Sequence, residues 1–224
     1  MDAPLASRLA LAGYTDPPTY RLGPVCRVLV RALNGGVAVV LPGTRPDHPA
    51  DDMADLTIGP LEIEPGKLAH EGFWRVGQMA FPRIAGLALQ GPIDIIGHSL
   101  GAGAVGAIAT MLVQAGIPLR SVWGFGTPRT AIRSWQRDLL FAAGVPVTLF
   151  RNGGDIVSRL PIHLESLALP WALKHLAATF LPGLGEWQNY GAEIQIGDGA
   201  RPLNVEDHAM EAYVAALGGA VPEC

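Results

Sequence analysis

The sequence predicts an α/β fold, in which helices cover a mostly parallel sheet that has an antiparallel edge near the N-terminus. Segments with strand-like and helix-like patterns alternate along the chain, which is typical of this class. Residues 37–41 and 93–96 are continuous apolar runs, as in strands buried on both faces. Residues 26–33 alternate apolar and polar side chains and are followed by the turn signal Asn34-Gly35-Gly36, so we expect a hairpin at the edge of the sheet.

Each predicted element rests on its periodicity and on the turn residues that bound it. The first helix, 5–14, is amphipathic and stops before Asp16-Pro17-Pro18. Residues 45–66 are polar and rich in turn formers, and residues 152–185 show no regular period. The expected order is helix 5–14, strand 26–33, strand 37–41, helix 69–89, strand 93–96, helix 100–115, strand 121–126, helix 132–143, strand 145–151, strand 193–196 and helix 205–217.

Composition limits the class of protein. The 224 residues suit a single domain spanning 1–224, and no linker or repeat divides them. Charged residues make up 16% of the chain, below the roughly 25% of an average soluble domain. The net charge of −4 argues against nucleic-acid binding, which needs a basic surface. Cys26 and Cys224 form neither a disulfide framework nor a zinc motif, so we expect no metal and no cofactor.

The sequence shows no transmembrane segment and no signal peptide. The longest apolar run, 100–113, is shorter than the roughly 18 residues of a membrane span. The N-terminus lacks the basic and long apolar regions of a leader. These features favour a cytoplasmic protein unless a leader has been removed. They leave the localisation and the oligomeric state otherwise open.

Gly97-His98-Ser99-Leu100-Gly101 is the strongest motif. It follows a predicted buried strand and opens a predicted helix, which is the context that the G-x-S-x-G nucleophile turn requires. The serine must adopt a strained backbone there, and side chains two residues to either side would collide across the turn. We therefore expect Ser99 to be a nucleophile, with the backbone N–H of Leu100 available to a developing oxyanion.

A serine nucleophile needs a histidine base and an acid that orients it, and in this type of fold they follow in the order serine, acid, histidine. The candidate acids are Asp138, Asp155 and Glu165, and the candidate bases are His163, His175 and His208. Asp155 is favoured because it lies in a glycine turn just after a buried strand, where sites of α/β folds collect. His208 is favoured because it stands where the last predicted helix begins, and the neighbouring Asp207 is a poor orienter.

These residues resemble the class 3 lipases, the fungal-type or Rhizomucor-like family of the α/β-hydrolase fold. The resemblance covers nearly the whole chain and rests on several motifs in the same order. They are 39–44 (VVLPGT), 54–56 (ADL), 70–73 (HEGF), 97–102 (GHSLGA), 124–129 (GFGTPR), 152–161 (NGGDIVSRLP), 190–194 (YGAEI) and His208.

The resemblance implies that Ser99, Asp155 and His208 form a catalytic triad and that Thr44 and Leu100 supply the two N–H groups of the oxyanion hole. It also implies that His70 is structural, and we interpret it as a buried hydrogen-bonding residue. The chain departs from the family in its apparent lack of a leader and of disulfides. In the lid region, roughly 46–56, Met53 stands where many members have an aromatic residue.

The leading interpretation is therefore a serine ester hydrolase, a lipase or carboxylesterase, that cleaves acylglycerols or similar lipid esters. A feruloyl- or cutinase-like esterase is the alternative within enzymes, and a non-catalytic lipid-binding module is the alternative outside them. The apolar segment 167–184 predicts contact with an acyl chain or a lipid surface, with Trp171 as the anchor. Six arginines between Arg120 and Arg159 suggest either a solvated face or attraction to anionic headgroups.

Overall fold

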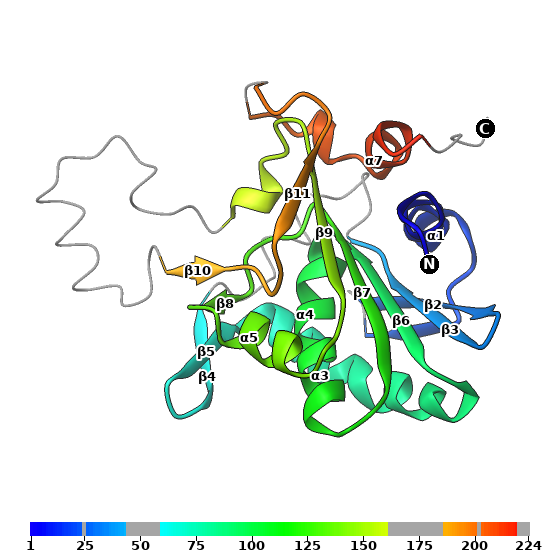
Figure 1. Cartoon of the computed structure of the whole chain (residues 1–224), viewed down its shortest axis with the longest axis vertical. Helices are drawn as coiled ribbons and strands as arrows, with labels where there is room; N and C mark the ends of the chain where they lie inside the picture. The colour runs from blue at the N-terminus through cyan, green and yellow to red at the C-terminus, as the bar shows by residue number, and fades with distance from the viewer. Residues whose placement is uncertain (24–25, 44–58, 161–185, 201–202, 219–224) are drawn as a thin grey trace, which may run out of the picture.

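The computed structural model describes residues 1–23, 26–43, 59–160, 186–200 and 203–218. Thr44, the lid region 46–56, Trp171 and the alternative site candidates His163, Glu165 and His175 lie outside these residues. The main sheet has seven strands in the order β1-β2-β3-β6-β7-β9-β11 (Figure 1). They span Tyr20–Leu22, Cys26–Leu33, Gly36–Leu41, Ile93–His98, Leu119–Phe125, Val147–Asn152 and Glu193–Ile196.

The pairing confirms a mostly parallel sheet with an antiparallel edge. Strands β1, β2 and β3 pair antiparallel, and every pair from β3 to β11 is parallel. All residues of β3 and β6 are buried, as the continuous apolar runs predicted. Strands β2 and β11 have the predicted bounds, and the other predicted strands shift by one or two residues at their ends.

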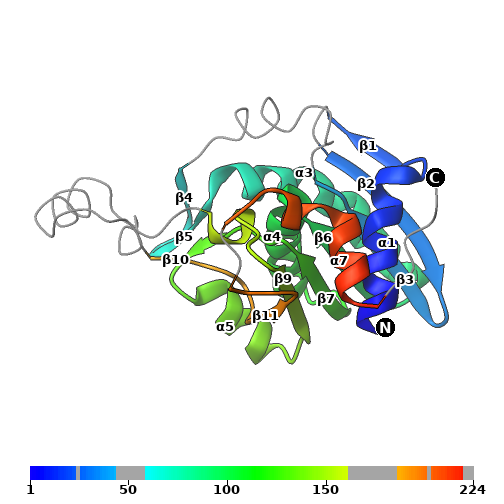
Figure 2. The same ribbon diagram turned by 90° about the horizontal axis from the view of Figure 1, so that it is seen from above.

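Helices cover both faces of this sheet because side chains of a strand point alternately to opposite sides. In β3, Val37, Val39 and Leu41 pack beneath α3 (Glu71–Gly86) and α4 (Leu100–Gln114). Ala38 and Val40 pack on the other side, beneath α1 (Ala3–Thr15) and α7 (Met210–Ala216). Figures 1 and 2 show these two layers with the sheet between them.

A second, antiparallel sheet was not predicted. Its strands are β4 (Pro60–Glu64), β5 (Lys67–His70), β8 (Ala131–Ile132) and β10 (Trp187–Gln188), in the order β10-β8-β5-β4. The predicted helix 69–89 was therefore wrong at its start, because Ala69 and His70 belong to β5. The missed signal is Pro65-Gly66, a two-residue hairpin loop in which Gly66 has φ +78°.

Two predicted helices also differ from the structure, one in its start and one by a break. The predicted helix 132–143 begins only at Trp135 as α5 (Trp135–Ala142), because Ile132 is in β8. The predicted helix 205–217 is a short 3-10 turn, Glu206–His208, followed by α7, since Ala209 between them has an extended backbone. This break separates His208 from the helix and leaves it in a turn. No helix among the described residues combines the length and apolar character needed to cross a bilayer.

Close approach of α4 to its neighbours depends on glycine. A Cβ at Gly106 would lie 2.3 Å from the ring of Tyr190, which is fully buried. A Cβ at Gly103 would lie 2.7 Å from Phe73 of α3, and one at Gly77 of α3 would lie 2.7 Å from Ala107. The small residues of α4 therefore let this helix pack tightly against α3 and Tyr190, and they hold its N-terminus at the end of β6.

We predict that Gly106→Ala lowers the free energy of unfolding by about 1–3 kcal/mol, the usual cost of overpacking. The added methyl overlaps a buried ring that has nowhere to move. Gly86→Ala is the matched control, because Gly86 is also helical and its Cβ would meet no atom within 4 Å. Urea unfolding of both variants measures the difference, and equal stability of the two would contradict this account of the packing.

Candidate active site

Ser99 lies at the sharp turn between β6 and α4, as predicted. Its backbone has φ 55° and ψ −128°, a left-handed conformation that is strained for a residue with a side chain. The turn is held because the N–H of Ser99 donates to the carbonyl of Phe125, at 3.0 Å, and its carbonyl accepts from Gly103. Ser99 is 7% exposed.

The glycines of the motif are required by contacts that the structure makes explicit. A Cβ at Gly97 would lie 2.5 Å from Cα of Ala102, so the predicted collision across the turn is real. A Cβ at Gly101 would instead lie 2.1 Å from the carbonyl oxygen of Leu41, at the end of β3. Gly43 is equally confined, since its Cβ would lie 2.6 Å from Cβ of Ser99. The end of β3 therefore lies directly against the nucleophile turn.

Asp155 and His208 are brought together from segments far apart in the chain. Asp155 follows β9 and is fully buried, and its Oδ2 lies 2.8 Å from Nδ1 of His208. Burial raises the pKa of Asp155, but the hydrogen bonds and charge of His208, with the hydrogen bonds of Tyr213 and Val157, outweigh it and leave the pKa below its ordinary value. Asp155 is thus a buried carboxylate that orients an imidazole.

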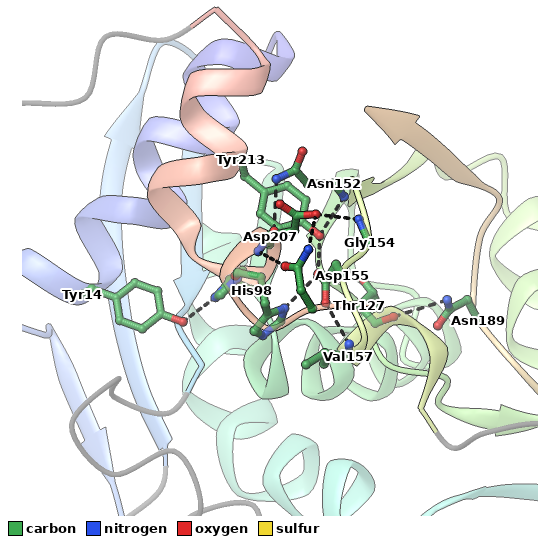
Figure 3. Close-up of polar contacts among 12 residues, drawn as sticks. Tyr14, His98, Thr127, Asn152, Gly154, Asp155, Val157, Asn189, Asp207 and Tyr213 are labelled. Carbon is green, nitrogen blue, oxygen red and sulfur yellow. Dashed lines mark hydrogen bonds and ion pairs between the residues drawn. The ribbon is translucent and has the colours of Figure 1, made fainter. Parts of the chain in front are cut away.

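Tyr213 is a residue of this site that sequence reasoning missed. Its hydroxyl donates to Oδ2 of Asp155 at 2.5 Å and accepts from the N–H of Asn152 at 3.1 Å (Figure 3). Burial and the nearby charge of Asp155 raise the pKa of Tyr213 well above its ordinary value, so the hydroxyl keeps the proton that it donates. A tyrosine in an apolar helix is indistinguishable in sequence from a core residue, and no other signal pointed to it.

Asp207 joins the loops that carry Asp155 and His208. Its Oδ2 accepts from the N–H of Gly154 at 2.7 Å and from the side-chain amide of Asn204 at 3.0 Å (Figure 3). The side chain of Asn152 donates to the carbonyl of Asp207, at 3.1 Å. Asp207 therefore binds the loop that carries Asp155, whereas Asp155 itself binds the Nδ1 atom of His208.

Nε2 is the ring nitrogen of His208 that Asp155 does not bind. This Nε2 is buried and has no hydrogen-bond partner among the described residues. Gly126 has φ 56°, and a Cβ there would lie 2.7 Å from Nδ1 of His208 and from Oδ2 of Asp155, so glycine leaves space for this pair. Leu100 is the first residue of α4, and the N–H groups of a helix's first turn have no partner within the helix.

The other candidates have ordinary surroundings. Asp138 is an exposed residue of α5 that accepts from Ser134. His70 is buried and stacks on Phe73 with ring centroids 4.1 Å apart. Among the described residues its Nδ1 has no hydrogen-bond partner, so the structure does not support the predicted hydrogen-bonding role at that atom. Burial lowers the pKa of His70 to about 4, which keeps its ring neutral.

Charged clusters among the described residues do not suggest another site. At least four of the six arginines between Arg120 and Arg159 form ion pairs with carboxylates that the structure describes, which favours a solvated face over a headgroup site. The pairs are Arg120 with Asp94, Arg133 with Glu186, Arg137 with Asp138, and Arg151 with Glu193. Within the described ranges, no three His, Cys, Asp or Glu side chains are grouped as ligands for a metal ion.

The fold is similar to solved structures of fungal triacylglycerol lipases. A Rhizomucor miehei triacylglyceride lipase matches with a TM-score of 0.53 and 24% identity over 61% of this chain and 56% of the lipase. The Rhizomucor miehei lipase in complex with its propeptide matches with a TM-score of 0.63 and 17% identity over 91% and 76%. A Penicillium expansum triacylglycerol lipase matches with a TM-score of 0.61 and 15% identity over 88% and 78%.

No protein-family model and no curated protein sequence matches the chain. The structural similarity establishes the fold of the chain, which is the α/β-hydrolase fold that its motifs predicted.

We predict that Asp155→Asn preserves the fold and, if the chain hydrolyses esters as its motifs predict, lowers kcat by on the order of 10⁴, as in the serine-hydrolase triad. An amide can still occupy the pocket between Tyr213 and Val157, but it cannot stabilise a protonated His208. Steady-state kinetics on a soluble ester, with circular dichroism to verify folding, measures the loss. Near-full activity of the folded variant would assign the acid to another residue.

The lowered pKa of Asp155 also predicts a pH dependence of stability. The charged carboxylate stabilises the folded state above its unfolded pKa of about 3.9. That stability is lost as the pH falls through the lower folded pKa. The difference in unfolding free energy between wild type and Asp155→Asn should therefore shrink as the pH falls from about 4 through the lower folded pKa of Asp155. Thermal unfolding at a series of pH values tests this, and a difference independent of pH would contradict it.

Proposed function

We propose that the protein is a serine ester hydrolase that acts through an acyl-enzyme. The observation that carries this proposal is the buried pair of Asp155 and His208, whose imidazole has an unpartnered Nε2, at the same sheet edge as the strained Ser99. All three residues follow the carboxyl ends of strands, where ligands of α/β folds bind. A binding module without catalysis would have no use for a serine with a strained backbone at the same sheet edge as an oriented imidazole.

In the proposed reaction, Oγ of Ser99 attacks the ester carbonyl while Nε2 of His208 takes its proton. Asp155 stabilises the imidazolium, and the N–H of Leu100, with that of Thr44, donates to the oxyanion. The tetrahedral intermediate breaks its bond to the alcohol oxygen, which receives the proton from His208. Water then attacks the acyl-enzyme by the same route and releases the carboxylic acid and free Ser99.

We propose a lipid ester as the substrate. The proteins of similar structure are named as triacylglycerol lipases, which supports an ester with an apolar acyl group. Two apolar side chains just before His208 are exposed, Leu203 at 52% and Val205 at 70%, and exposed apolar surface beside a site suits an acyl chain. Nothing in the described residues favours a feruloyl- or cutinase-type substrate over a lipid ester.

We expect a fluorophosphonate probe to label the wild type at one residue and to leave Ser99→Ala unlabelled, since the probe reacts with an activated serine. Ser158→Ala is the matched control, because Ser158 is also buried near Asp155 but lies in an ordinary 3-10 turn. Mass spectrometry identifies the labelled residue. A wild type that does not react, or labelling that persists in Ser99→Ala, would contradict the proposal.

The same protein should hydrolyse p-nitrophenyl esters, with kcat/KM rising as the acyl chain grows from acetate to decanoate. Burial of additional methylene groups in the transition state explains the expected rise, at up to about 0.8 kcal/mol for each. A preference for acetate, or for an aromatic ester, would favour a small ester over a lipid ester as the substrate and would leave the proposed serine mechanism unchanged.

A further inference from the structure

His98, between Gly97 and Ser99 in the nucleophile motif, has no role in the reaction proposed above. Its ring is buried and makes two hydrogen bonds, of which the one with Tyr14 is drawn in Figure 3. Nδ1 lies 2.5 Å from the hydroxyl of Tyr14, at the end of α1. Nε2 lies 2.8 Å from the backbone carbonyl oxygen of His208. His98 therefore connects the first helix with the segment that carries the proposed base.

The direction of each hydrogen bond follows from the donors present. The carbonyl of His208 can only accept, so Nε2 of His98 carries the proton and Nδ1 has a lone pair. Tyr14 consequently donates its hydroxyl proton to Nδ1. The oxygen of Tyr14 in turn accepts from the N–H of Gly43, at 2.7 Å. The chain of hydrogen bonds runs from Gly43 through Tyr14 and His98 to the carbonyl of His208.

Both ends of this chain border the reacting atoms. Gly43 is packed against Ser99, since a Cβ there would lie 2.6 Å from the serine Cβ. Gly43 also precedes Thr44, the residue proposed for the oxyanion hole. At the other end, the rings of His98 and His208 stack with centroids 4.7 Å apart and planes inclined by 27°.

We propose that Tyr14 and His98 are positioning residues. They hold the end of β3, which leads to the proposed oxyanion hole, and the imidazole of His208 at fixed distances from Ser99. The inference rests on the proposed ester hydrolase function and assigns these residues no contact with substrate. Positioning of this kind affects the rate because a shift of about 1 Å in a reacting group can cost 10²-fold.

The stacked arrangement also requires that His98 remain neutral when His208 gains a proton. Burial, followed by the charge of His208, lowers the pKa of His98 to about 3. Burial raises the pKa of Tyr14 above its ordinary value, so Tyr14 keeps the proton that it donates. The Tyr14 hydroxyl occupies the only lone pair of the His98 ring, so His98 is not a second base.

The first test compares Tyr14→Phe with Tyr190→Phe. Tyr190 is the matched control, because it is buried and its hydroxyl donates to the carbonyl of Ala102 without touching either histidine. Both variants lose one buried hydroxyl, with the bonds to His98 and from Gly43 lost in Tyr14→Phe and the bond to Ala102 lost in Tyr190→Phe, so both should lose some stability. We expect Tyr14→Phe to lower kcat on a soluble short-chain ester by about 10- to 100-fold with KM unchanged, whereas Tyr190→Phe keeps the kcat of wild type.

Two substitutions of His98 separate its two hydrogen bonds. In His98→Asn the side-chain amide oxygen takes the position of Nδ1 and can still accept from the hydroxyl of Tyr14. In His98→Gln the side-chain NH2 takes the position of Nε2 and can still donate to the carbonyl of His208. We expect both variants to lower kcat. Tyr14→Phe should cost less in His98→Gln, where only the bond from Gly43 remains to be lost, than in His98→Asn, where the bond to residue 98 is lost as well.

Nitrogen-15 NMR of the wild-type histidine rings tests the hydrogen-bond chain without a variant. We expect the His98 ring to show a protonated Nε2 and an unprotonated Nδ1 near neutral pH. The opposite tautomer overturns the inference, as does a folded Tyr14→Phe that turns over the ester as fast as wild type. A wild type with the expected tautomer but no ester turnover instead removes the proposed function, and the positioning role with it.

Discussion

The close contact between the end of β3 and the turn at Ser99 is the constraint on which the rest of the site depends. Ser99 can adopt its strained backbone only because Gly97, Gly101 and Gly43 leave room for one another and for the carbonyl oxygens of β3. The strain is compensated by hydrogen bonds to Phe125 and Gly103 and by the tight packing of α4. A buried parallel sheet supplies the rigidity that such a turn needs.

The acid and base side of the site is built in a different way. Asp155 and His208 lie in loops, and loops are held in place by polar contacts rather than by the sheet. Tyr213 and the N–H of Val157 bind the carboxylate, and Asp207 bonds the two loops to each other. These contacts replace the water that Asp155 loses on burial, so the carboxylate remains charged where it is needed. The proposed chain through Tyr14 and His98 would join this side to the end of β3.

The sequence predicted the main sheet well and the second sheet not at all, for a physical reason. Strands buried on both faces, such as β3 and β6, show their burial in continuous apolar runs. Strands of two residues, such as β8 and β10, are too short to show any period, and their pairing depends on partners far along the chain. His70 was consequently placed in a helix, although β5 ends there and α3 begins one residue later.

The sequence by itself determined the sharp turn at Ser99, which local sterics control, and the buried strands, which continuous apolar runs reveal. It predicted Asp155 as the acid from its glycine turn after a buried strand, and His208 as the base from its position where the last predicted helix begins. It could not show their contact, because the two residues are 53 positions apart in the sequence. Only the tertiary structure revealed Tyr213, Tyr14 and the role of Asp207. Their function depends on hydrogen bonds between elements distant in sequence, and a residue type alone does not specify its partner across the fold.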